Sequence, residues 1–115
     1  MSKRADNLLV DDIAIAIQKI LDFTNGISFN EFTNDVKTFD ATIRNFEVIG
    51  EAASKLSESF ILKNHTIEWH KMISTRNHLI HGYFGIDAKI IWNIIQNILP
   101  ILKIQINELL NALKD

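Results

Sequence analysis

The chain has 115 residues, no cysteine and one proline, and its 12 basic and 14 acidic side chains give a formal net charge of −2. With 47% hydrophobic and 23% charged residues, it can bury a core, which excludes intrinsic disorder and predicts one domain over residues 1–115. The lack of cysteine excludes disulfides and thiolate chemistry, and the slight acidity argues against a broad nucleic-acid surface while allowing a small anion site. No apolar run approaches the roughly 18 residues of a membrane span, so we expect a soluble, cytoplasmic protein.

The first predicted helix covers about residues 4–23. Its apolar side chains recur at helical spacing and define one buried face. They are Leu9, Ile13, Ala16, Ile17, Ile20 and Leu21. Asn25 and Gly26 then provide a helix stop and a turn. Ser28 followed by Glu31 has the spacing of a capping box, which predicts the start of a second helix.

The second predicted helix is long, because apolar residues alternate in threes and fours from Phe29 to Leu56, and it could break near Asn34. Gly50 lies in this apolar row, where glycine costs about 1 kcal/mol relative to alanine, and this indicates that another backbone passes close by. A stripe of charges runs along the same helix: Asp40, Arg44, Glu47, Glu51 and Lys55. Of these, Arg44, Glu47 and Glu51 could line a cleft, organise the bundle or form an exposed salt-bridge ladder, and these interpretations stay open.

Two more helices are predicted in the C-terminal half. One covers about residues 69–81 and stops at Gly82, with Trp69, Met72, Ile73, Leu79 and Ile80 on its buried face. The other follows the N-cap Asp87, covers about residues 88–113 and should kink near Pro100. Its predicted core face contains Ile91, Ile94, Ile95, Ile98, Leu102, Leu109 and Leu113, and Ile90, Ile101 and Ile104 widen the apolar arc enough to need a second partner. Because no stretch alternates with period two, we expect an all-α, up-and-down bundle of four to five helices.

All four histidines lie in the 17 residues from His65 to His81. Near them, Arg76, Asn77 and His81 surround the junction between two helices, a place that suits a functional site. Histidine can move a proton near neutral pH, and a guanidinium can hold a phosphate, so the pair fits phosphodiester cleavage by a ribose 2′-hydroxyl without a metal. Residues five apart are about 140° apart on a helix, however, and an arginine and a histidine that merely cap the helix end remain the alternative.

A metal site is the weaker interpretation of the same segment. His78 and His81 are three residues apart, but no H-E-x-x-H pattern is present, and Asp87 would be an unusual third ligand. His65 and His70 follow no ligand spacing and should be solvated or partly packed. We therefore expect no metal and no cofactor.

The sequence "RNHLIHGY" from Arg76 to Tyr83 resembles the R-x-x-x-x-H-x-Y motif of the HEPN superfamily, and specifically its HepT-like toxins. The segments "IRNFEVIGEAASKL" (43–56) and "IEW…RNHLIHGYFGID…IW" (67–92) also follow the family's order. Together they cover most of the chain and are more specific than the motif alone. Glu68 stands where the family pattern has proline, which concerns only the start of the third helix.

This resemblance implies an all-helical homodimer whose two motifs face a shared cleft and act as a metal-independent RNA endonuclease. Arg76 and His81 would be the catalytic pair, with Asn77 as a supporting polar residue. Tyr83 would be the residue that a cognate MNT-type nucleotidyltransferase antitoxin modifies with AMP, although it could also simply pack beside Phe84. The expected partners are RNA, the antitoxin and a second copy of the chain, with no DNA and no membrane.

Two other functions remain open at this point. The chain could be a catalytically silent helical module that docks a nucleotidyltransferase and contributes nucleotide or substrate binding. It could also be a purely structural helical dimer, which would require Arg76 and His81 to be buried or to point away from each other.

Overall fold

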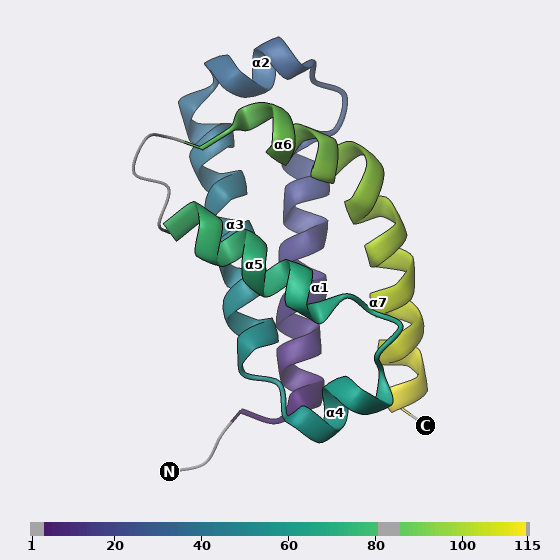
Figure 1. The fold of residues 1–115 in the computed structure, drawn as a ribbon. Coiled ribbons are helices and arrows are strands. Elements are labelled where there is room, and N and C mark those ends of the chain that lie inside the picture. The colour runs from purple at the N-terminus through teal and green to yellow at the C-terminus, as the bar shows by residue number, and fades with distance from the viewer. Residues whose placement is uncertain (1–3, 81–85, 115) are drawn as a thin grey trace.

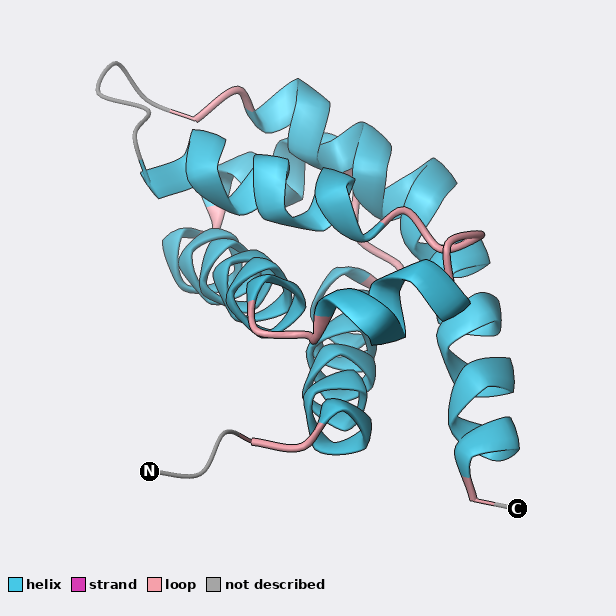
Figure 2. Cartoon of the chain, turned by 60° about the horizontal axis from the view of Figure 1, so that its bottom comes forward, coloured by secondary structure: helices cyan, strands magenta, loops and turns pink. Residues whose placement is uncertain are grey.

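The computed structural model describes residues 4–80 and 86–114, and these residues are helical with no strand (Figures 1 and 2). The expected all-α class is therefore confirmed. In chain order the elements are α1 (Asp6–Thr24), α2 (Phe29–Asn34), α3 (Val36–Ser54), α4 (Glu58–Lys63), α5 (Trp69–Ile80), α6 (Ala88–Asn93), the π-helical turn η1 (Ile94–Ile98) and α7 (Leu99–Leu113). Within the described ranges, no helix combines the length and hydropathy that a membrane crossing requires.

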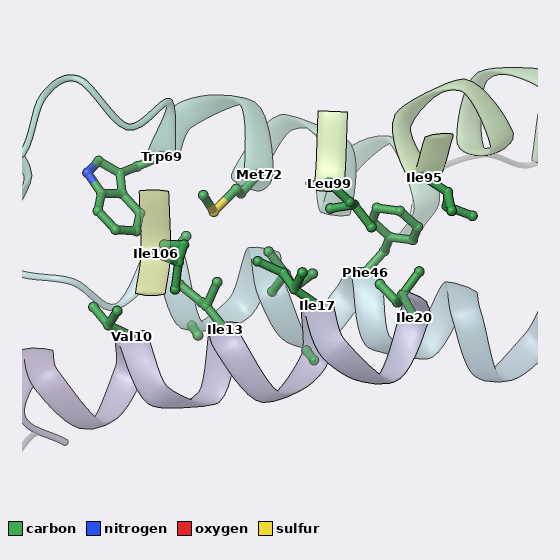
Figure 3. Close-up of a cluster of buried hydrophobic side chains, with 14 of the residues drawn as sticks. Val10, Ile13, Ile17, Ile20, Phe46, Trp69, Met72, Ile95, Leu99 and Ile106 are labelled. Atoms are coloured by element: carbon green, nitrogen blue, oxygen red, sulfur yellow. The ribbon is translucent and has the colours of Figure 1, made fainter. Parts of the chain in front are cut away.

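The core lies where α1, α3, α5 and the C-terminal helix meet. Helix α1 packs against both α3 and α7, and α5 crosses in front of α3 and α1 in Figure 1. Figure 3 shows side chains of α1 pointing toward Trp69 and Met72 of α5 and toward Leu99 and Ile106 of α7. The predicted buried face of α1 is confirmed except for Leu21, which is half-buried.

The break predicted near Asn34 falls at Asp35, between α2 and α3. Ser28 and Glu31 form the predicted capping box at the start of α2, with backbone-to-side-chain distances of 2.9 and 3.1 Å. Asp35 leaves the helical conformation and caps α3, because its carboxylate accepts hydrogen bonds from both the Thr38 amide and the Thr38 hydroxyl. The cap fixes where α3 begins, and with it the direction of the charged stripe.

Helix α4 is one that the sequence analysis did not predict. Ser57 caps it, and the carboxylate of Asp6 accepts hydrogen bonds from both the Ser57 amide (2.9 Å) and the Ser57 hydroxyl (2.7 Å). These contacts join the start of α1 to the start of α4 (Figure 1). A two-turn helix has too few positions to show an apolar period, so only its capping serine signals it.

Pro100 disturbs the last helix, as predicted, but the disturbance lies one turn earlier. Proline has no N–H to donate and its ring crowds the carbonyl four residues before it, so the chain inserts the π-helical turn η1. There the Leu99 amide donates to the Ile94 carbonyl, five residues back. The extra residue in this turn rotates everything that follows.

This rotation makes part of the predicted core face wrong. Ile91 and Ile95 are buried as expected, but after the π turn the buried positions are Leu99 and Ile106. Ile98 is 48% exposed and Leu113 is 40% exposed. A separate error concerns Ile80 of α5, which precedes the π turn. It is also predicted to be buried, but it is 50% exposed. The three isoleucines that widened the apolar arc, Ile90, Ile101 and Ile104, are all exposed, as that prediction requires.

Candidate active site

Arg76 occupies a position in the buried row of α5. Trp69, Met72 and Leu79 are the buried residues of this helix, and Arg76 falls between Met72 and Leu79 at the spacing of three and four that keeps side chains on one face. An apolar residue would be the usual choice at such a position. Instead the arginine stem lies against α3, and only 21% of its side chain is exposed. Packing against α3 therefore holds the aliphatic part of the Arg76 side chain in place.

Gly50 of α3 makes this position possible. A Cβ atom at Gly50 would lie 2.1 Å from the Cβ of Arg76 and 2.8 Å from the backbone oxygen of Met72, both of which are shorter than any real contact. The close backbone approach predicted from Gly50 is confirmed, and the backbone that passes is that of α5. Any side chain at residue 50 would move Arg76 away from α3.

The Arg76 guanidinium is fixed by two side chains. Nη2 donates to Oε2 of Glu51 on α3 at 2.6 Å, and Nη1 donates to Oδ1 of Asn77 at 2.8 Å. These partners are side chains rather than the helix-end carbonyls that a simple capping role would use. Within the described residues, two of the five guanidinium N–H groups are thus engaged, and each terminal nitrogen keeps one N–H for a ligand.

Glu51 is itself part of a short charge network. Its other carboxylate oxygen lies 3.3 Å from Nζ of Lys55, the residue that follows the last turn of α3. The hydrogen bond from Lys55 and the positive charges of Arg76 and Lys55 lower the pKa of the Glu51 carboxyl. Glu51 is therefore ionised at neutral pH, and Arg76, Glu51 and Lys55 together carry a net charge of about +1. The site attracts an anion only weakly from a distance.

The rest of the charged stripe behaves as an exposed ladder. Arg44 and Glu47 approach to 3.8 Å, and the Arg44 side chain is 73% exposed. This contact stays within α3. Of the interpretations left open for the stripe, the ladder describes the contact between Arg44 and Glu47, whereas Glu51 reaches across to α5. Arg44 and Glu51 also border a hollow between α1 and α3.

Of the predicted site residues, the structure describes Arg76 and Asn77. His81 and Tyr83 lie outside the described residues, so their roles stay predictions. His65, His70 and His78 are exposed. Across residues 4–80 and 86–114, no three potential ligands among His, Cys, Asp and Glu come together.

The sequence places Glu51 in the charged stripe but does not predict its contact with Arg76. The signal was its position beside Gly50. A glycine that admits a neighbouring helix also brings the adjacent residue next to that helix. Gly50, Glu51 and Arg76 thus place an oriented guanidinium at the crossing of α3 and α5 in an all-helical protein.

Comparison with known proteins names the class more closely. The family model described as "Ribonuclease HepT-like" matches residues 13–109, so the chain belongs to the HepT-like ribonuclease family. It is similar to "Putative RNase MJ0127" of Methanocaldococcus jannaschii, with 45% identity over 100 residues, covering 87% of this chain and 83% of the relative. It is also similar to "Probable ribonuclease HepT" of Thermococcus cleftensis, with 40% identity over 101 residues, covering 88% of this chain and 92% of the relative. No solved structure gives a significant match.

Proposed function

We propose that this protein is a metal-independent RNA endonuclease in which Arg76 and His81 form the catalytic pair. The observation that carries the proposal is the placement of Arg76. Its stem is buried against Gly50, its guanidinium is oriented by Glu51 and Asn77, and its tip remains accessible. The ribonuclease names of the relatives support an RNA substrate.

The proposed reaction is attack of a ribose 2′-hydroxyl on the neighbouring phosphorus. The new 2′-O–P bond forms as the bond to the 5′-oxygen breaks, which leaves a 2′,3′-cyclic phosphate and a 5′-hydroxyl. His81 takes the proton from the 2′-hydroxyl or gives one to the leaving oxygen. Arg76 stabilises the charge that develops on the phosphate oxygens, and Asn77 holds the guanidinium in place through its side-chain oxygen. Neither service requires a metal ion.

We further propose that the protein is a homodimer. The exposed isoleucines Ile98 and Ile101 border an apolar groove of about 400 Å³ between α5 and the C-terminal helix. Exposed apolar surface of this kind is typical of a protein interface. A dimer would bring two copies of the motif into one cleft, which allows one histidine to accept a proton while the other donates one.

The biological role that fits this activity is that of a toxin in a toxin–antitoxin pair. In this proposal an MNT-type nucleotidyltransferase antitoxin attaches AMP to Tyr83. Phosphates placed two residues from His81 would compete for the guanidinium of Arg76 and repel the RNA backbone. Cleavage would then stop without any change in the fold.

The first test compares the parent protein with Arg76→Ala and His81→Ala. Each variant should lose at least about a hundredfold in cleavage rate and no longer arrest growth, because a phosphate contact or a proton transfer is lost. Circular dichroism spectra should match the parent, and both variants should unfold cooperatively on heating. The proposal fails if either well-folded variant cleaves RNA and arrests growth as strongly as the parent.

The second test addresses the partner and the modification. The chain is expressed alone and together with the proposed MNT-type nucleotidyltransferase, and the intact mass and RNA cleavage of both preparations are measured. We expect a mass gain in multiples of AMP on Tyr83 together with lost cleavage. Unmodified dimer that cleaves no RNA but still binds the nucleotidyltransferase would instead show a silent docking module.

A further inference from the structure

Among residues 4–80 and 86–114, Glu51 is the one charged partner that Arg76 has on a different helix. Its carboxylate accepts from Nη2 at 2.6 Å, a distance typical of a strong charge-assisted hydrogen bond. Asn77, the second partner, is neutral and is the next residue of the same helix. Only Glu51 therefore relates the direction of the guanidinium to the position of α3.

No hydrogen bond to Nε among the described residues fixes the direction of the guanidinium. Nε of Arg76 is buried and has no hydrogen-bond partner among the described residues. The stem packs beside Gly50, which sets where the side chain begins but not how its planar end is turned. The rotation of the guanidinium plane thus rests on the two contacts at its terminal nitrogens.

The carboxylate of Glu51 is held in turn. Lys55 lies 3.3 Å from its other oxygen, at the favourable spacing of four residues along the helix. Lys55, Glu51, Arg76 and Asn77 form a chain of contacts that runs from α3 to the residue after Arg76. Because Lys55 restores the positive charge that Glu51 cancels, the network orients the guanidinium and keeps a net charge of about +1.

We propose that Glu51 is a positioning residue for the RNA cleavage reaction: it turns the Arg76 guanidinium so that its two free N–H groups face the phosphate in the transition state. This inference rests on the ribonuclease activity proposed above. Glu51 touches no substrate atom in this account. Its negative charge lies near a polyanion, so it weakens RNA binding slightly while it raises the rate of the bound complex.

This combination gives a signature that loss of folding cannot imitate. Glu51→Gln keeps the shape of the side chain but replaces a charged acceptor with a neutral one, so kcat should fall about tenfold. Glu51→Ala removes the contact, and kcat should fall roughly a hundredfold, as expected for a misplaced catalytic group. In both variants KM should stay the same or decrease. Partial unfolding would instead lower the apparent kcat of each variant only in proportion to the fraction of molecules that remain folded.

Glu47→Gln is the matched control. It removes the same charge from the same helix, one turn earlier, where the partner is Arg44. This variant should keep the kcat of the parent. If Glu51→Gln and Glu51→Ala keep it as well, or if Glu47→Gln loses as much as they do, Glu51 is not a positioning residue.

A spectroscopic measurement separates this proposal from the proposed function. In ¹⁵N spectra of arginine side chains, a tethered guanidinium rotates slowly and gives separate terminal nitrogen signals, which Arg76→Lys would assign by deleting them. We expect slow rotation in the parent and fast rotation in Glu51→Gln. Equal rotation in both proteins would overturn the positioning role even if the parent cleaves RNA. A parent that cleaves no RNA would overturn the proposed function, while the spectra would still decide whether Glu51 holds Arg76.

Discussion

Helix α5 meets its two neighbours in opposite ways. On the α3 side the approach is so close that residue 50 has no room for a Cβ, and a charged network joins the two helices. On the side of the C-terminal helix an apolar groove of about 400 Å³ stays open, with exposed Ile98 and Ile101 at its border. Tight packing fixes the direction of one side chain, whereas loose packing leaves surface for another molecule. The close contact between α3 and α5, called the tight seam, suits a functional site. The groove beside the C-terminal helix, called the open seam, suits binding of another molecule.

The largest expected effect comes from adding one carbon atom to the tight seam. Gly50→Ala should destabilise the protein by about 1–3 kcal/mol, because overpacking forces α5 away from α3. It should also reduce RNA cleavage, since Arg76 moves with α5. Urea denaturation and cleavage rates measure the two effects.

Gly26→Ala is the control for this change. Gly26 has a φ of +77° and an open surrounding, so alanine there should lower stability through backbone strain but leave cleavage per folded molecule unchanged. Equal loss of cleavage per folded molecule at both glycines would show that the α3–α5 seam has no special relation to the site.

A smaller effect is expected at the open seam. Ile101→Glu places a charge on a side chain that is 61% exposed, so the monomer should lose no more than about 0.5 kcal/mol. If the groove faces a second copy, the dimer dissociation constant should rise at least roughly tenfold, because an unpaired charge is buried in the interface. Sedimentation over a dilution series measures it.

Leu62→Glu is the matched control for the association test. Leu62 is 68% exposed on α4, away from the groove. The dimer should tolerate this variant. A dimer that both variants weaken equally, or that neither weakens, would exclude the groove as the interface.

The smallest expected effect is the response of the tight seam to acid. The pKa of Glu51 is lowered in the folded protein by Lys55 and Arg76, so the stability that this carboxylate adds is present above its unfolded pKa of about 4.3. It is lost as the pH falls through the lower folded value. Stability should thus be flat in this respect from pH 7 to about 5 and decline below about 4. In Glu51→Gln the decline, followed by urea denaturation, should be shallower, and an identical decline would contradict the ionic contact.

Much of the fold could be predicted because its signals are local. The capping box at Ser28, the cap at Asp87 and the apolar row of α1 each depend on residues within a few turns of one another. The π turn could not be predicted in the same way. Pro100 indicates that the helix must yield, but whether it bends or inserts a residue depends on packing against the core, and this choice decides that Leu99 rather than Ile98 is buried.

The site shows the same division. The motif residues Arg76 and Asn77 could be named from the sequence, and Gly50 predicted the close approach of another backbone. The contact from Glu51 to Arg76 joins residues 25 positions apart. No spacing rule within one helix can reveal such a pair, because it depends on how α3 and α5 cross.

The most direct test of the central claim is cleavage of a defined single-stranded RNA by the purified protein in the presence of EDTA. The substrate is compared with the same RNA carrying one 2′-deoxyribose at the cleaved position. We expect the parent to cleave the RNA into products with 2′,3′-cyclic phosphate and 5′-hydroxyl ends and to leave the deoxy-substituted site intact, with Arg76→Ala inactive on both. Cleavage that requires a divalent metal, proceeds at the deoxy site or persists in Arg76→Ala would contradict the account.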